Sequence, residues 1–169
     1  CDLTTRATGG YDSVWLIDHL ATPANNQLDL LEGWTLAAAL AARTEQIRIG
    51  HLVTCDPFRH PAVLAKMVAT VDNIANGRLD LGLGWGSMAE ELRAFGVSEE
   101  PNKLRALRMR ETLEILSLMF SGEQFDYSGT HYQLHGARGV PKPQQNPVPI
   151  HIGGGGPQLT MPLVRDFAH

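Results

Sequence analysis

The sequence lacks the features that mark a protein for a membrane, for nucleic acid or for a metal. No apolar run approaches the roughly 20 residues of a membrane span, and no charged-then-apolar leader is present. The net charge is −4 and no run of Lys and Arg suggests a track for a phosphate backbone. The seven histidines are scattered, without an H-E-x-x-H or Cys-x-x-Cys pattern. We therefore expect no membrane, nucleic-acid or metal partner.

Cysteine is scarce as well. Cys1 and Cys55 have no metal-type spacing and could make at most one disulfide, so a reduced, cytoplasmic protein is expected. The sequence starts at Cys1 rather than Met, which weakens any conclusion about targeting. Its 169 residues, 43% of them hydrophobic and 19% charged, fit one globular domain.

What the sequence does contain is an alternation of strand and helix patterns. Four segments are predicted as strands: 11–17, 47–54, 79–84 and 150–152. Four are predicted as helices: 30–44, 61–76, 104–120 and 159–167. A polar loop is expected over 22–29 and a small hairpin over 125–134. Strand–helix alternation implies a parallel α/β sheet, either open and doubly wound or part of a (β/α)₈ barrel, whose closed form needs about 250 residues.

The segment 58–86 has the strongest local pattern. Pro61 suits a first helical turn and Asn76-Gly77 a left-handed stop. A single apolar stripe is predicted for the helix between them, formed by Val63, Met67, Val71 and Ile74. In the strand that follows, leucines alternate with Asp80, Gly82 and Gly84, so one face is apolar and the other nearly bare. A bare face that leads to a glycine-rich loop leaves room for a flat ligand.

A series of motifs runs along nearly the whole chain, from about Gly9 onward. They include Gly10-Tyr-Asp-Ser-Val-Trp-Leu-Ile-Asp-His19, Phe58-Arg-His-Pro-Ala-Val-Leu-Ala-Lys66, Gly77-Arg-Leu-Asp-Leu-Gly-Leu-Gly-Trp85 and Pro149-Ile-His-Ile-Gly-Gly154. In this order they resemble the luciferase-like monooxygenase superfamily, in its branch of flavin- or F420-dependent oxidoreductases. The resemblance implies a partial (β/α)₈ TIM barrel: strands two to five, with the hairpin as an insertion. Residues 1–169 would then form a single, incomplete barrel domain, a fragment of a longer chain.

The resemblance also implies F420 or FMN at the C-terminal strand ends, and hydride transfer between that cofactor and a small-molecule substrate. A homo-oligomer, a dimer, is expected. Two alternatives stay open. One is a nicotinamide-binding Rossmann domain, although Gly82-x-Gly84-x-Gly86 is not G-x-G-x-x-G. The other is a non-catalytic relative of the barrel enzymes.

By the same resemblance, His19 would be the catalytic acid or base and Asp18 would lie beside the cofactor ring. A neutral His is suited to give or take the proton that accompanies hydride transfer. The alternative is that both residues merely cap the next element. Leu52, Val53 and Thr54 would support the ring, with a non-proline cis peptide between Leu52 and Val53; the alternative there is a regular strand end.

Two glycine loops complete the expected site. Gly84, Trp85 and Gly86 would let the ring approach the backbone, unless these glycines only permit tight packing. The run Gly153, Gly154, Gly155 and Gly156 would bind the cofactor phosphate, unless it is only a flexible turn.

Three expectations concern the surroundings of these loops. Ser87 stands where some sugar-phosphate-oxidising relatives carry a carboxylate, which argues against that substrate class. Glu90 and Glu91 are expected to be solvated carboxylates at a helix start. Trp15 and Trp34 are expected in the core, and Arg59 and His60 in capping or surface roles.

Overall fold

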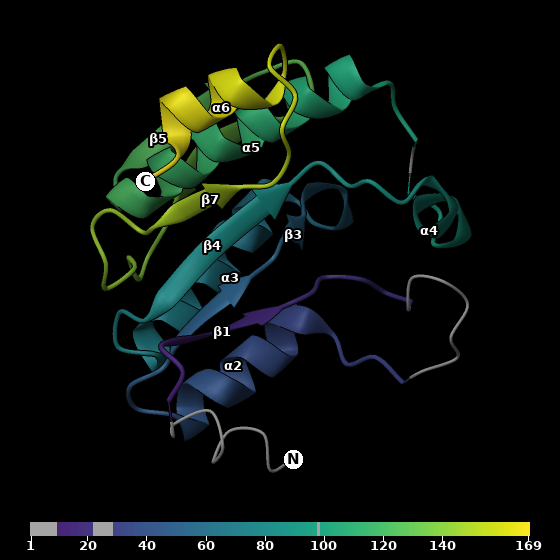
Figure 1. Cartoon of the computed structure of the whole chain (residues 1–169). Helices are drawn as coiled ribbons and strands as arrows, with labels where there is room; N and C mark the ends of the chain where they lie inside the picture. Colours follow the sequence, from purple (N-terminus) through teal and green to yellow (C-terminus); the bar gives the residue numbers. More distant parts are fainter. Residues whose placement is uncertain (1–9, 22–28, 98) are drawn as a thin grey trace.

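The computed structural model describes residues 10–21, 29–97 and 99–169 and contains one parallel sheet (Figure 1). Cys1 and most of the polar loop expected over 22–29 lie outside the described residues. The strands are β1 (Ser13–Leu16), β2 (Arg48–His51), β3 (Thr54–Cys55), β4 (Leu79–Gly84) and β7 (Ile150–Ile152). β1 pairs with β2, β2 and β3 both pair with β4, and β4 pairs with β7, always in parallel. The predicted parallel α/β sheet is confirmed.

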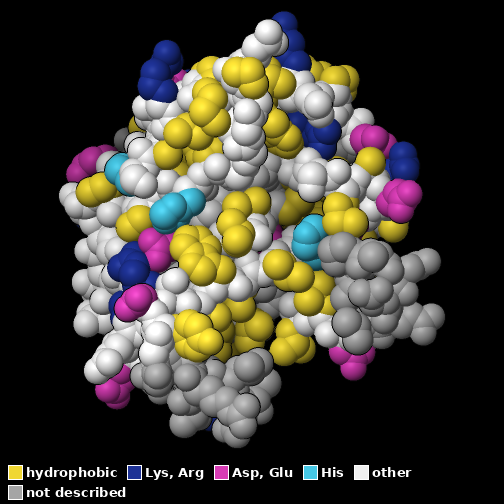
Figure 2. Space-filling model, viewed as in Figure 1, with side chains coloured by type: hydrophobic (Ala, Val, Ile, Leu, Met, Phe, Trp, Pro, Cys, Tyr) yellow, Lys and Arg dark blue, Asp and Glu magenta, His cyan; other side chains and the backbone are white. Residues whose placement is uncertain are grey.

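Helices cover one face of this sheet. They are α2 (Gly33–Arg43), α3 (Pro61–Ile74), α5 (Asn102–Ser121) and α6 (Thr160–Phe167). Each contacts the next in that order, so they form an arc along the sheet, and the main apolar core lies between helices and strands (Figure 1). Hydrophobic side chains also gather on the surface seen in Figure 2. The exposed large hydrophobic residues include Trp15, Ile17 and Leu52. None of the described helices is both long and apolar enough to cross a membrane.

The ends of the helices follow from the local sequence. Pro61 is the first residue of α3, and His60 caps it by accepting a hydrogen bond from Ala62 N–H through its side chain, which confirms the expected capping role.

Asn76 and Gly77 have positive φ after the last turn of α3, as predicted. Gly122, with φ of 77°, ends α5 in the same left-handed conformation. Pro162 lies in the first turn of α6, where it is tolerated.

The apolar stripe predicted for α3 is wrong in part. Val63 and Ile74 are exposed, whereas the buried face includes Leu64, Val68 and Val71. The buried face also includes Ala65 and Ala69, whose small side chains let α3 lie close to its neighbours. The prediction followed the large residues and so selected a stripe rotated away from the sheet.

The two tryptophans behave differently. Trp34 is buried and stacks on the ring of His51, with ring centroids 4.2 Å apart, which confirms its place in the core. Trp15 is 37% exposed and does not lie in the core as expected. Its strand β1 is at the edge of the sheet, and its ring lies over Gly50 on the open face, where an added Cβ would come within 2.5 Å of it.

The predicted hairpin is confirmed as β5 (Gln124–Ser128) and β6 (Gln133–Arg138), an antiparallel pair. Its turn is held to α5 by Glu111, whose carboxylate accepts hydrogen bonds from three successive backbone N–H groups, those of Thr130, His131 and Tyr132. These bonds lower the pKa of Glu111 even though its burial acts in the opposite direction. The insertion is therefore a fixed part of the domain.

Candidate active site

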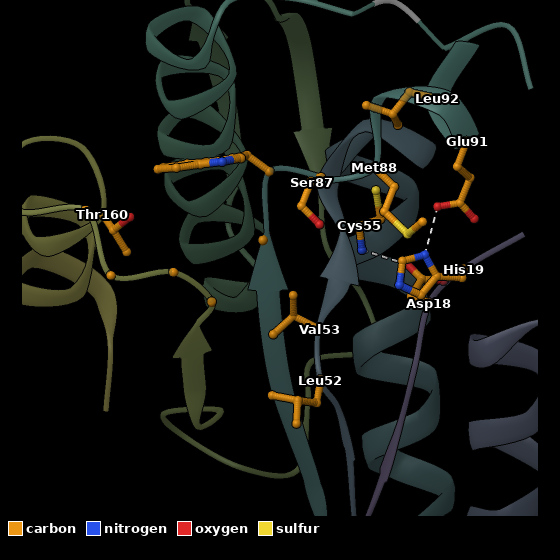
Figure 3. Close-up of a pocket in the computed structure, with 17 residues that line it drawn as sticks. Asp18, His19, Leu52, Val53, Cys55, Ser87, Met88, Glu91, Leu92 and Thr160 are labelled. Atoms are coloured by element: carbon orange, nitrogen blue, oxygen red, sulfur yellow. Dashed lines mark hydrogen bonds and ion pairs between the residues drawn. The ribbon is translucent and has the colours of Figure 1, made fainter. Parts of the chain in front are cut away.

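A cavity of about 430 Å³ opens where the parallel strands end (Figure 3). Four loop regions contribute to its lining: Asp18 and His19 after β1; Leu52, Val53 and Cys55 around β3; Gly84 to Met88 after β4; and Gly153 to Gly156 after β7. Glu91, Leu92 and Thr160 complete the lining. Parallel strands bring their C-terminal ends to one edge, which is where such folds place ligands. The structure thus brings His19 and the tetraglycine loop to the same end of the sheet, as expected.

Thr54 is the one predicted site residue that does not line the cavity. Its side chain is fully buried in β3, with no hydrogen-bond partner for its hydroxyl among the described residues. Leu52 and Val53, immediately before it, do line the cavity, and the peptide bond between them is cis, as the family resemblance implied.

The glycine face of β4 is covered by the chain segment that joins β2 to β3. An added Cβ on Gly82 would overlap the carbonyl oxygen of His51, and one on Gly84 would lie 2.7 Å from a methyl group of Val53. An added Cβ on Gly153, which directly follows β7, would lie 3.1 Å from the methyl groups of the same Val53 side chain. The glycines therefore admit the irregular segment between β2 and β3. Gly84 and Gly86 line the cavity, whereas Gly82 does not, so the expectation that Gly82 leaves this side of the strand open was wrong.

The loop after β4 is bound by a side chain of α5. The guanidinium of Arg105 on α5 donates to the backbone oxygen of Gly86 at 2.6 Å, and Gly86 itself has φ of 81°. Ser87 and Met88 continue the loop along the cavity wall (Figure 3). The sequence did not indicate Arg105, because it lies on a different helix, 19 residues further along.

His19 is bound by Glu91, from the short helix α4 (Ala89–Ala94). Glu91 Oε2 lies 2.8 Å from His19 Nδ1 (Figure 3). Its Oε1 accepts hydrogen bonds from Leu20 N–H at 2.6 Å and Ala21 N–H at 3.2 Å. Glu90 is exposed, but Glu91 is 8% exposed, so the expectation that both are solvated was wrong for Glu91. The chain after β1 reaches over to α4, where two backbone N–H donors and the His19 ring surround this carboxylate in place of water.

Asp18 lines the cavity, but its carboxylate is engaged by the protein. It accepts two hydrogen bonds from Arg59, at 2.5 and 2.7 Å, and one from Cys55 N–H at 2.8 Å. Arg59 also donates to Glu32, which caps α2. This arrangement braces the ends of β1 and β3 beneath the cavity. Both carboxylate oxygens of Asp18 thus have protein donors, and its contact with a cofactor ring stays a prediction.

Burial changes the proton affinities of two groups near the site. It raises the pKa of the Cys55 thiol to about 12, with a further contribution from the charges of Asp18 and Glu91. It lowers the pKa of His51, which stacks behind the site on Trp34, so that this imidazole is neutral at physiological pH. Among the described residues, no group of three or more His, Cys, Asp or Glu side chains could hold a metal ion.

The tetraglycine loop leads to a threonine that sequence reasoning missed. Thr160, the first residue of α6, is 1% exposed, and its hydroxyl has no partner among the described residues although it lines the cavity. An added Cβ on Gly154 would lie 2.9 Å from that hydroxyl, whereas Gly155 has open space around it. Open backbone, the positive end of a helix and an unpaired hydroxyl together suit an anionic group. A Thr at a helix start after a glycine run was the available signal.

Comparisons with known proteins identify the relatives of this chain. The model of the luciferase-like monooxygenase family matches residues 5–161. An F420-dependent glucose-6-phosphate dehydrogenase of Amycolatopsis mediterranei is 35% identical over 155 residues, which cover 88% of this chain and 44% of that protein. The enzyme of the same name from Microbacterium testaceum is 36% identical, over 89% of this chain and 45% of its own length. The chain spans less than half the length of these curated relatives.

Solved structures show the same fold. An F420-dependent secondary alcohol dehydrogenase, in complex with an F420–acetone adduct, superposes with a TM-score of 0.84 at 24% identity, over 93% of this chain and 48% of that one. A type II Baeyer–Villiger monooxygenase, the oxygenating constituent of 3,6-diketocamphane monooxygenase of Pseudomonas putida with FMN, gives 0.80 at 23% identity, over 98% and 49%. These matches confirm the expected partial barrel.

Proposed function

The chain belongs to the luciferase-like monooxygenase family, and on this basis we propose that the full-length gene product is an F420- or FMN-dependent oxidoreductase. It would transfer hydride between the cofactor and a small organic substrate. One observation carries the proposal: a single cavity at the C-terminal strand ends is lined by His19, the Leu52–Val53 segment and both glycine loops. A volume of about 430 Å³ lies within the usual range of small-molecule sites, roughly 300–1,000 Å³.

The residues present fit such a cofactor. The flat ring would lie against Leu52 and Val53, with the backbone of Gly84 to Gly86 beside it. The phosphate would lie at Gly153 to Gly156, with the unpaired hydroxyl of Thr160 as a donor. When bound, the cofactor supplies a carbon or nitrogen centre that accepts or returns hydride.

His19 would handle the proton that accompanies the hydride. Its side chain is 28% exposed at the cavity and within reach of a substrate lying over the ring. Asp18 and Arg59 would fix the loop that carries it. The protein would thus accept or donate the substrate's proton through His19, and the cofactor would accept or donate the hydride.

We further propose a substrate other than a sugar phosphate. Ser87, at the cavity wall, offers a hydroxyl and no carboxylate, and its neighbours Met88 and Leu92 are apolar (Figure 3). A small, mostly apolar substrate suits this wall better than a phosphorylated sugar.

Three wider features belong to the same proposal. Residues 1–169 would form one incomplete barrel domain of a longer protein, which would assemble as a dimer and reside in the cytoplasm. A Rossmann site receives no support, because Gly82 and Gly84 pack against the segment that precedes β3.

Titration of the full-length protein with F420 and with FMN, followed by visible absorbance, tests the proposal. We expect saturable binding of one of the two. Thr160→Val should weaken it about 10- to 100-fold, since a hydrogen bond to a charged group is worth about 1.5–3 kcal/mol. Thr70→Val, on the outer side of α3, serves as the control and should leave affinity unchanged. If neither cofactor binds, the proposal fails; equal affinity of the Thr160 variant would reject only the phosphate position.

A further inference from the structure

Glu91 and His19 form a contact that the proposed function does not itself require. The two residues come from different segments that line the cavity, Glu91 from α4 after β4 and His19 from the chain after β1. Their side chains are 6% and 28% exposed, so the carboxylate is buried while the imidazole still reaches the cavity. This geometry is that of a base held by a second, buried group.

We propose that Glu91 is a positioning residue that holds His19 in the tautomer protonated at Nδ1, so that Nε2 faces the substrate as a proton acceptor. The inference rests on the proposed function for its catalytic consequence. Its structural part, the tautomer, stands on hydrogen bonds alone.

The number of donors around Glu91 decides the tautomer. Oε1 already accepts from the backbone N–H groups of Leu20 and Ala21, at 2.6 and 3.2 Å. Oε2, 2.8 Å from His19 Nδ1, is an acceptor because an ionised carboxylate has no hydrogen to donate. Nδ1 must therefore carry the hydrogen. In a neutral imidazole, Nε2 is then the unprotonated nitrogen.

The chemical consequence concerns an alcohol substrate. A bound oxidised flavin or deazaflavin would accept the hydride with its electron pair as the carbon–hydrogen bond breaks. The hydroxyl proton passes to Nε2 of His19, the C=O double bond forms, and the imidazole becomes an imidazolium with both nitrogens protonated. In the reverse direction the imidazolium returns that proton to a carbonyl oxygen. Glu91 keeps the ring orientation constant throughout and stabilises the charged form.

Glu91→Gln should reverse the tautomer with almost no change of shape. The single amide oxygen of Gln satisfies Leu20 and Ala21 N–H, so its NH₂ group faces Nδ1. An NH₂ group is a donor only, so Nδ1 becomes the acceptor and Nε2 carries the hydrogen. A pocket nitrogen that is already protonated cannot take the substrate proton. Replacing the carboxylate by an amide in another His–carboxylate pair lowers kcat about 10⁴-fold through the wrong tautomer.

The test combines NMR with kinetics on the full-length protein. In protein labelled with ¹⁵N at histidine, we expect His19 to show the Nδ1–H pattern, its signals being identified by their loss in His19→Gln. Glu91→Gln should shift them to the Nε2–H pattern and lower kcat at least about 100-fold, with cofactor affinity unchanged. Glu90→Gln, an exposed neighbour, is the matched control and should change neither.

Two results would overturn the proposal: an Nε2–H pattern in the wild-type protein, or a Glu91→Gln variant with unaltered tautomer and kcat. The wild-type spectrum decides the structural part even if the variant does not fold. Because the spectrum needs no cofactor, its outcome is independent of whether the proposed oxidoreductase function holds. Failure to bind F420 and FMN would reject that function while leaving the tautomer measurable.

Discussion

The guanidinium of Arg59 donates to both carboxylate oxygens of Asp18, at 2.5 and 2.7 Å, in a pair that is almost wholly removed from solvent. Arg59 directly follows the 3₁₀ turn η1 (Asp56–Phe58), and Asp18 directly precedes His19. The second Arg59 amino group also reaches Glu32 at the start of α2. One side chain thus joins three segments of the chain beneath the candidate site, and the position of His19 depends on it.

Arg59→Ala should lower the free energy of unfolding by about 3–5 kcal/mol, because it leaves the buried carboxylate of Asp18 without its partner. Urea unfolding of the full-length protein measures this. Arg93→Ala is the matched control: Arg93 and Glu99 form an exposed pair at 3.0 Å, and its loss should cost less than about 1 kcal/mol. Equal effects of the two variants would show that the Asp18–Arg59 pair does not stabilise the fold.

Gly82→Ala should destabilise the protein severely, by more than about 3 kcal/mol, since the added methyl group would overlap the backbone oxygen of His51, which cannot move without displacing β2. Gly155→Ala is the comparison, because nothing lies within 4 Å of its added Cβ. Thermal unfolding should show a large loss of Tm for the first variant and almost none for the second. A Gly82→Ala protein with normal Tm would contradict the described packing of β4 against this segment.

Much of the fold could be predicted because its signals are local. Pro61 and Gly77 mark the limits of α3, and the alternation over 79–84 marks β4. The order of these elements was sufficient to predict parallel strands and hence one edge that gathers the strand ends. Side-chain exposure was less predictable where it depends on neighbours, as for Trp15 at the sheet edge.

The contacts that hold the site could not be predicted from local patterns. Asp18 and Arg59 are 41 residues apart in sequence, and His19 and Glu91 are 72 apart. Nothing in the pair Glu90-Glu91 says which carboxylate turns inward; the loop after β1 decides it by supplying backbone N–H donors. Likewise a glycine at position 82 indicates a close approach, but not that the approaching group is the carbonyl of His51.

Acid should lower the free energy of unfolding, and part of this loss should come from protonation of Glu32. Burial would raise the pKa of this carboxyl, but hydrogen bonds from Thr35, Trp34 and Arg59 outweigh it and lower the pKa from 4.5 to about 2. Because the folded pKa lies below the unfolded one, the stabilisation is complete above pH 4.5 and is lost as the pH falls toward 2. Glu32 is 39% exposed, so solvent screening limits the effect to about 1 kcal/mol.

Glu32→Gln tests this dependence. The variant should be less stable than the wild type at pH 6.5, and the difference should shrink at pH 2.5, where the wild-type carboxylate has begun to accept its proton. Urea midpoints of both proteins at the two pH values provide the measurement. A difference that stays constant, or grows in acid, would show that the ionised form of Glu32 does not contribute to stability.

Cys55 should be unreactive toward alkylating reagents although it lines the cavity. Burial and the nearby carboxylates raise the pKa of its thiol to about 12, and the thiolate is the form that reacts. At pH 8 a free cysteine with pKa of about 8.5 is roughly one quarter thiolate, whereas Cys55 is about 10⁻⁴ thiolate, so alkylation should be about 10³-fold slower. Iodoacetamide labelling of Cys1→Ser protein, followed by mass spectrometry, isolates Cys55, and the same protein in urea should react at the free-thiol rate. Fast labelling of the folded protein would contradict the burial of this thiol at the cavity wall.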